Sequence, residues 1–142
     1  MTGAVKPHFE YPVRVYWEDT DAGGVVFYAN YLKFFERART EWLRSLGHEQ
    51  QRLKDEGGAM FVVTDTRTRH LKPARLDDLL HIDVVLAERS RATLTLRQHA
   101  RRAGELLAEG EVRIACVEPG TFRPRRIPNP LLEAMPDIAM HP

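Results

Sequence analysis

The sequence predicts an α+β fold in which one antiparallel sheet is wrapped around a single long helix. The N-terminal segment from Phe9 alternates apolar and polar residues, which is typical of a half-buried strand. A long amphipathic segment follows, and the next four segments have the composition and alternation of strands. One such helix and one such sheet must cover each other's apolar faces, so this order predicts five strands around the helix.

Length and composition favour one globular domain. The chain has 142 residues, of which 43% are hydrophobic and 29% charged, and this size suits one domain. We expect that domain to span residues 1–142, with its core at about 9–128 and a short C-terminal tail. The net charge of +1 argues against a nucleic-acid partner.

The predicted elements follow one another closely. We expect a first strand whose inward face carries Phe9, Tyr11, Val13, Val15 and Trp17. After an acidic loop at 18–24, apolar residues at helical spacing predict a long helix, with Gly47 at its end. These helical positions are Tyr31, Phe35, Ala38, Trp42 and Leu46.

The second half of the chain reads mainly as strands. A short helix over about 49–56 leads to strand-like segments at 60–71, 80–87, 93–100 and 106–116, and a short helix is expected around 129–135. Leu106 is expected to face inward with Ala108, whereas His81 and Asp83 are expected on an exposed polar face.

Cysteine and histidine patterns give no sign of a disulfide or a metal site. Cys116 is the single cysteine, and we expect it to be a small buried hydrophobe. The histidines show no spacing typical of metal ligands. No signal-peptide pattern or membrane-length apolar run is present, so we expect a cytoplasmic protein.

The loop before the long helix carries the candidate chemistry. Glu18, Asp19 and Asp21 crowd there beside Gly23 and Gly24. Such a loop is most often a turn that caps the helix. It also places a carboxylate beside glycine amides and the unpaired N–H groups of a helix start, which is an arrangement suited to acyl transfer. The residues alone leave both interpretations open.

A resemblance to a known family favours the second interpretation. The segment VRVYWEDTDAGGVVFYANYLKFFERARTEWLRSLG resembles the opening of the 4-hydroxybenzoyl-CoA thioesterase group of hotdog proteins, and most of all the YbgC-type, Tol–Pal-associated acyl-CoA thioesterases. PARLDDLLHIDVVL and the closing Arg-Ile-Pro of residues 126–128 also resemble that group. The resemblance therefore covers nearly the whole chain.

The resemblance implies a hotdog fold and an acyl-CoA thioesterase. It assigns the catalytic carboxylate, as nucleophile or general base, to Asp21 and the oxyanion donor to the backbone N–H of Tyr28. Gly24 would lie where the backbone approaches the thioester. Many wider relatives have Gly-His in this motif, but Val25 follows Gly24 here, so we expect no histidine-assisted mechanism. No cofactor is expected, because CoA is part of the substrate.

The same resemblance suggests partners. Similar basic turns in the group meet the nucleotide end of CoA, which points to Arg89 and Arg91, although exposed arginines at a turn can also be merely solvated. We expect a homodimer or a homotetramer. Two alternatives remain open: a thioesterase acting on acyl carrier protein, and a non-catalytic acyl-CoA-binding scaffold of a cell-envelope or phospholipid-synthesis complex.

Overall fold

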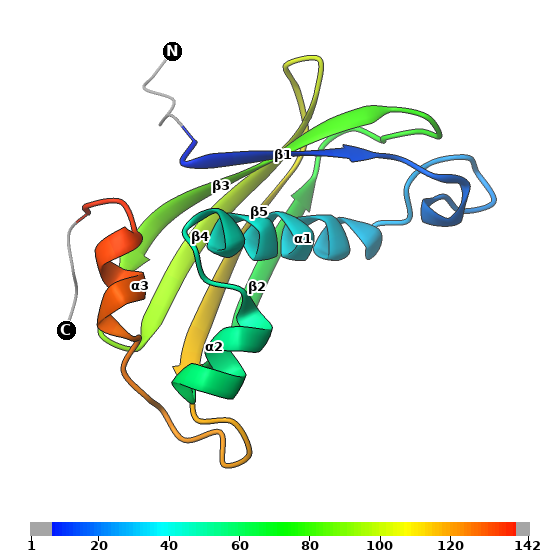
Figure 1. Cartoon of the computed structure of the whole chain (residues 1–142). Helices are drawn as coiled ribbons and strands as arrows, with labels where there is room; N and C mark the ends of the chain where they lie inside the picture. Colours follow the sequence, from blue (N-terminus) through cyan, green and yellow to red (C-terminus); the bar gives the residue numbers. More distant parts are fainter. Residues whose placement is uncertain (1–6, 139–142) are drawn as a thin grey trace.

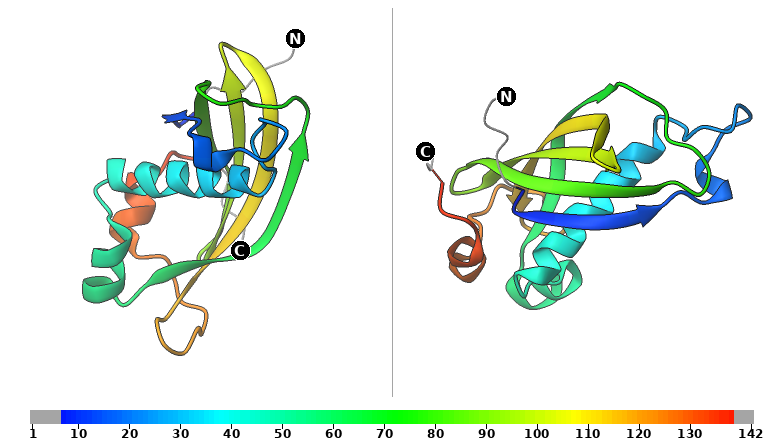
Figure 2. Two further views of the ribbon diagram at one scale, coloured as in Figure 1. Left: turned by 90° about the vertical axis from the view of Figure 1, so that its right-hand side faces the viewer. Right: turned by 90° about the horizontal axis from the view of Figure 1, so that it is seen from above.

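Five antiparallel strands form one sheet, and the helices α1, α2 and α3 lie on the same face of it (Figures 1 and 2). The structure, a computed structural model, describes residues 7–138, so the first six and last four residues of the predicted domain lie outside it. The elements are β1 (Phe9–Arg14), the 3-10 helix η1 (Trp17–Asp19), α1 (Asn30–Ser45), α2 (Gln50–Gly57), β2 (Met60–His70), β3 (Leu79–Arg89), β4 (Thr93–Arg102), β5 (Glu105–Val117) and α3 (Asn129–Ala134).

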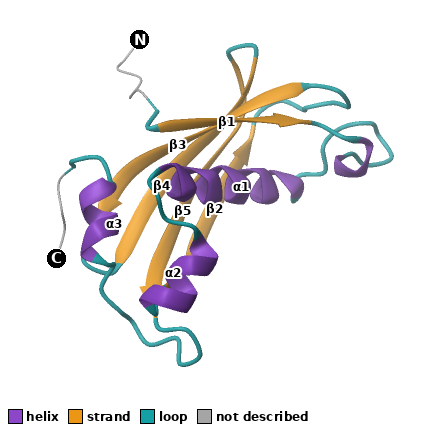
Figure 3. Cartoon of the chain, in the orientation of Figure 1, coloured by secondary structure: helices purple, strands orange, loops and turns teal. Residues whose placement is uncertain are grey.

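The strand order of the sheet is β1-β3-β4-β5-β2, which confirms the predicted antiparallel hotdog sheet. β3, β4 and β5 form a meander joined by short turns, and β1 and β2 are the two edges (Figure 3). Pro12 lies in β1, where the missing N–H is tolerated because an edge strand has one unpaired side. Among residues 7–138, β5 is the one pairing partner of the other edge, β2.

The core lies between α1 and the concave face of the sheet. Phe35 and Trp42 of the helix are at most 3% exposed, as the predicted helical face requires. Gly110 of β5 allows this close packing, because a Cβ at that position would lie 2.9 Å from Phe35 Cε2. Cys116 is completely buried on the inward face of β5, as predicted.

Three expectations about which side chains are buried are wrong. Trp17 is 77% exposed, because the chain turns into η1 before the strand alternation reaches it. Leu107, not Leu106, is fully buried, and the β4–β5 register shifts near this point. Asp83 does share the outer face of the sheet with His81, but it is only 1% exposed.

Neighbouring side chains on β4 cover Asp83. Its Oδ2 accepts a hydrogen bond of 2.8 Å from Arg101, and its Oδ1 accepts one of 2.8 Å from the His99 backbone N–H. A carboxylate becomes tolerable out of water when its oxygens are paired in this way.

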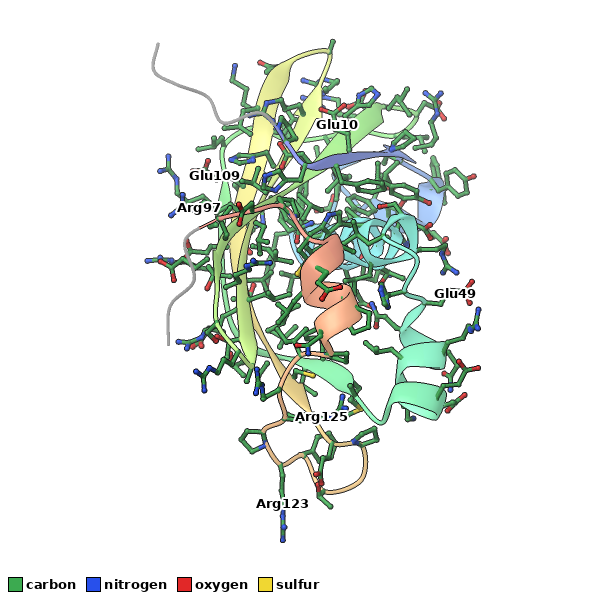
Figure 4. All side chains as sticks on the ribbon, turned by 60° about the vertical axis from the view of Figure 1, so that its left-hand side comes forward. Glu10, Glu49, Arg97, Glu109, Arg123 and Arg125 are labelled. Carbon is green, nitrogen blue, oxygen red and sulfur yellow. The ribbon has the colours of Figure 1, made fainter. Side chains whose placement is uncertain are left out.

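The outer face of the sheet is charged. Arg97 and Glu109 project from it, on the side opposite the helices (Figure 4). Glu111 accepts hydrogen bonds from Arg67 at 3.0 Å and Arg97 at 3.3 Å. These two hydrogen bonds lower the pKa of Glu111. The cross-strand pairs keep this face compatible with water, while the opposite face holds the core.

Candidate active site

The acidic loop between β1 and α1 is a small closed hairpin. The N–H of Asp21 donates to Val25 O at 2.9 Å, and the N–H of Phe27 donates to Asp19 O at 3.1 Å. A second loop braces it, because the N–H of Val26 donates to Ala74 O at 2.8 Å. The hairpin is therefore an ordered platform immediately before α1.

The first aspartate of the Asp-Thr-Asp sequence is structural. Asp19 is 5% exposed, and its Oδ2 accepts a hydrogen bond of 2.8 Å from the Tyr16 N–H. Its backbone oxygen also accepts a 2.8 Å hydrogen bond from Asn30 Nδ2, which ties the loop to the first residue of α1. Asp19 holds the platform in shape and is not available to a substrate.

The second aspartate is exposed. Oδ1 of Asp21 accepts a hydrogen bond of 2.8 Å from the Gly23 N–H, and within residues 7–138 its Oδ2 has no hydrogen-bond donor. The next glycine, Gly24, has φ +79°, a backbone conformation that glycine adopts without strain. The turn therefore fixes one carboxylate oxygen and leaves the other free.

The start of α1 offers an unused amide. In the described part of the chain, the N–H of Tyr28 donates to no acceptor. The N–H of Ala29 likewise donates to no acceptor among residues 7–138, whereas Asn30 N is bonded to Phe27 O at 2.8 Å and Tyr31 N to Tyr28 O at 3.2 Å. Ala29 caps the helix without a side-chain hydrogen bond. The free N–H groups of a helix start carry partial positive charge, which favours an anion or an oxyanion.

The carboxylate and the amide belong to the same ordered hairpin. The Asp21–Val25 pair lies two residues along the hairpin from the Asp19–Phe27 pair, which is about 7 Å at the rise of a strand. Tyr28 follows Phe27 directly, so its amide lies at the end of the hairpin that leads into α1.

A histidine ring lies beside the two tyrosines at the start of α1. His70, at the end of β2, lies with its ring centroid 6.0 Å from that of Tyr28 and 5.3 Å from that of Tyr31. Burial raises the pKa of the Tyr31 phenol, and a hydrogen bond with the Ala74 backbone opposes that shift. The sequence could not predict that His70 lies here. Helices α1 and α2 separate the hairpin from β2, and no sequence pattern relates the two segments.

The two predicted CoA-binding arginines are not beside Asp21 in the same chain. β3 starts next to the hairpin, since Val15 N donates to Asp78 O at 2.9 Å, and it ends at Arg89. Ten steps along a strand amount to about 33 Å, so Arg89 and Arg91 lie at the opposite end of the sheet. Arg89 also donates to Leu132 O of α3 at 2.9 Å, whereas Arg91 is exposed.

The described residues contain neither a metal-binding cluster nor a membrane-spanning helix. Within 7–138, no three or more His, Cys, Asp or Glu side chains are grouped so as to hold a metal ion. In that same part of the chain, no helix has both the length and the apolar character needed to span a membrane.

Comparison with known proteins shows which family the chain belongs to. Residues 15–135 match the model of the thioesterase-like superfamily. The acyl-CoA thioesterase YbgC of Haemophilus influenzae is 46% identical over 121 residues, which are 85% of this chain and 89% of that protein. The acyl-CoA thioester hydrolase YbgC of Escherichia coli O157:H7 is 45% identical over 87% of this chain and 92% of its own.

Solved structures agree with this assignment. A probable thioesterase from Bartonella henselae superposes with a TM-score of 0.80 at 35% identity, over 84% of this chain and 98% of that one. The chain has a five-stranded sheet around α1 and an Asp-Thr-Asp hairpin, and it is similar to these relatives over most of its length. It therefore belongs to the thioesterase-like superfamily and, within it, to the YbgC acyl-CoA thioesterases.

Proposed function

We propose that this protein hydrolyses acyl-CoA thioesters at the hairpin before α1. The observation that carries the proposal is the pairing of an exposed carboxylate, Asp21, with the unused N–H of Tyr28 at a helix start. The names of the relatives from Haemophilus influenzae and Escherichia coli support the same reaction. CoA is part of the substrate, so the reaction requires no cofactor.

The proposed steps follow from the two groups. The thioester carbonyl oxygen lies against the N–H of Tyr28, and Gly24 lets the backbone approach the thioester. Asp21 either attacks the carbonyl carbon itself or takes a proton from an attacking water, and both routes give a tetrahedral adduct. The carbon–sulfur bond then breaks, and CoA leaves as a thiolate that takes up a proton. In the first route this leaves an anhydride on Asp21, which water hydrolyses to release the acid and restore the carboxylate. One oxyanion donor of this kind typically contributes about 100-fold to 1,000-fold in rate.

Replacing Asp21 with asparagine tests the proposal. The asparagine side chain keeps an oxygen that can accept from the Gly23 N–H, so the Asp21→Asn protein should fold normally while kcat falls by roughly 100-fold to 10,000-fold. Asp77→Asn is the matched control, because Asp77 is exposed, lies in the neighbouring loop and has φ +72°, which asparagine also adopts. Wild-type turnover by Asp21→Asn would remove Asp21 from the chemistry.

Two further measurements separate the alternatives. Label in the Asp21 carboxyl after a single turnover in isotope-labelled water identifies the anhydride route, because a general base leaves label in the product acid alone. Comparing kcat/KM for the same acyl group on CoA and on acyl carrier protein identifies the carrier. Binding of acyl-CoA without any turnover would favour a scaffold over an enzyme.

We further propose that the active form is at least a homodimer that joins through β2. This edge carries unpaired backbone groups over 11 residues, and Val63 on it is 52% exposed. A two-fold axis would pair β2 with its own copy in antiparallel orientation. Such pairing brings the far end of the partner's sheet, with Arg91 of the partner subunit, toward the hairpin of this one.

A complementation experiment tests this arrangement. If Arg91 serves the partner's site, mixing Asp21→Asn subunits with Arg91→Glu subunits creates heterodimers that have one intact site. KM should then fall toward the wild-type value as subunits exchange, because a contact with CoA phosphates contributes mainly to substrate binding. If the mixture behaves as the sum of its two parents while light scattering shows heterodimers, the assignment of Arg91 is wrong.

A further inference from the structure

His70 lies where the open edge of the sheet meets the start of α1. It is the last residue of β2 and is paired with Ala108 of β5. Ala108 lies two residues from Gly110, which packs against α1, so Ala108 and its partner His70 face the helix as well. The chain is held directly after His70, because Leu71 N donates to Leu107 O at 2.8 Å. The edge strand therefore presents an imidazole to α1 from a fixed backbone.

The imidazole of His70 contacts two tyrosines at the helix start. Its ring centroid lies 5.3 Å from that of Tyr31 and 6.0 Å from that of Tyr28, and the pair with Tyr28 is T-shaped. Tyr28 and Tyr31 are three positions apart, so they are neighbours on the surface of the first turn. Both separations lie within the range of about 4.5–7 Å that is typical of attracting aromatic rings. His70 therefore packs against both tyrosines at once.

One of these tyrosines is fixed and the other is exposed. Tyr31 is 3% exposed, and its phenol has a hydrogen bond with the Ala74 backbone. Tyr28 is 64% exposed, and in the described part of the chain the aromatic rings that pack on it are those of Phe27, at 4.7 Å, and His70. His70 therefore connects the exposed ring to the buried one.

The amides at the start of α1 have no hydrogen bond that would fix their direction. The N–H groups of Tyr28 and Ala29 donate to no acceptor among residues 7–138, and the side chain of Ala29 offers no cap. Hydrogen bonds do hold the flanking residues, since Phe27 N donates to Asp19 O at 3.1 Å and Asn30 N to Phe27 O at 2.8 Å. Packing of the Tyr28 side chain is an additional restraint on the two free amides between them. An oxyanion donor is effective when its direction is fixed before the reaction.

The contacts of His70 use the shape of its ring. Among the described residues, neither ring nitrogen of His70 has a hydrogen-bond partner, and the side chain is exposed. Its neighbours on the inner face of the two strands, Thr68, Ala108 and Gly110, are uncharged. A flat ring at this position can therefore make the same contacts with Tyr28 and Tyr31 without an imidazole.

We propose that His70 is a positioning residue for thioester hydrolysis, whose ring holds Tyr28 against Tyr31 and so directs the free N–H groups at the start of α1. This inference rests on the proposed hydrolysis at the hairpin and adds a residue to it. His70 acts through Tyr28 and does not touch the reacting atoms. Because a displacement of about 1 Å can lower a rate by about 100-fold, loss of the ring should affect kcat more than KM.

Two substitutions separate the ring from the imidazole. In His70→Ala, kcat for an acyl-CoA should fall by about 10-fold to 100-fold while KM changes by less than about threefold. In His70→Phe, which retains a ring, kcat should stay within about threefold of the wild-type value. His81→Ala is the matched control, since His81 is exposed on the outer face of β3 and its loss should leave both constants unchanged. Circular dichroism at the assay temperature gives the folded fraction, so that a loss of stability is not mistaken for a loss of rate.

A second measurement needs no turnover. Nitrogen-15 relaxation reports how rigidly the N–H groups of Tyr28 and Ala29 are held, and a rigid backbone has an order parameter of about 0.85. The order parameters of both groups should be near this value in the wild type and in His70→Phe, and clearly lower in His70→Ala. This result would connect the ring to the amides and not merely to the stability of the fold.

The outcomes separate this role from the hydrolysis itself. Wild-type kcat in folded His70→Ala overturns the role of His70, and so does an effect confined to KM. If His70→Phe is as slow as His70→Ala, the imidazole takes part in the chemistry and a positioning role is wrong. Unchanged order parameters in His70→Ala lead to the same conclusion. All these results leave thioester hydrolysis intact, whereas failure to hydrolyse every acyl-CoA tested overturns the proposed function, and this inference with it.

Discussion

Removing the Asp19 carboxylate should destabilise the protein although the residue lies in a surface hairpin. In Asp19→Ala the Tyr16 N–H loses its 2.8 Å acceptor at a site where the side chain is only 5% exposed. Hydrogen bonds to a charged partner contribute about 1.5–3 kcal/mol, and the loss falls at the upper end when the remaining group stays buried. At about 3–4 °C per kcal/mol for a chain of this length, Tm should fall by roughly 5–10 °C.

The assay is thermal unfolding followed by circular dichroism, at one protein concentration because association shifts Tm. Asp21→Ala is the comparison: its carboxylate is exposed, so its Tm should stay within about 2 °C of the wild-type value. Equal Tm values for Asp19→Ala and the wild type, or an equal fall in both variants, would refute the division between a structural and a reactive aspartate.

Two other predictions concern backbone strain and pH. Gly24→Ala should cost about 1–2 kcal/mol, measured by urea unfolding, because φ is +79° and no atom lies within 4 Å of the added Cβ; unchanged stability would show that the turn relaxes. Arg67 and Arg97 lower the pKa of Glu111 below its ordinary 4.5, so its ionised form adds stability above about pH 4.5 that disappears as pH falls through the lowered value. The contribution is below about 1 kcal/mol because the pair is partly exposed. Arg97→Gln should raise that pKa in a carboxyl NMR titration, and an unaltered titration would contradict the pairing.

Local patterns in the sequence predicted most elements of the fold. The alternation in β3, β4 and β5 and the helical spacing in α1 predicted these elements because each depends on neighbours in the sequence. The errors fall where distant segments decide the outcome. Asp83 carries the sequence signal of an exposed residue, but it is buried because Arg101 and His99 of the next strand reach over it. Trp17 follows the strand pattern in sequence, but the chain has already turned.

The site was predictable to the same extent. Asp21, Gly24 and Tyr28 lie within one contiguous motif, so a resemblance could point to all three. The sequence could not say that Asp19 is buried, because that depends on the hydrogen bond to Tyr16. It could not reveal the hydrogen bond between Arg39 and Gln98 either, because Gln98 lies 59 positions away in β4.

The strand order also has a consequence for the way the chain folds. β3, β4 and β5 pair with sequence neighbours, whereas β1 pairs with β3 across the whole of α1, α2 and β2. Because long loops close slowly, we expect the meander to form first and β1 to dock late. Late-forming edges are also the first to open in the native state. Amide hydrogen exchange should therefore be faster in β1 than in β4, and the hairpin that follows β1 should open with it while the meander stays protected.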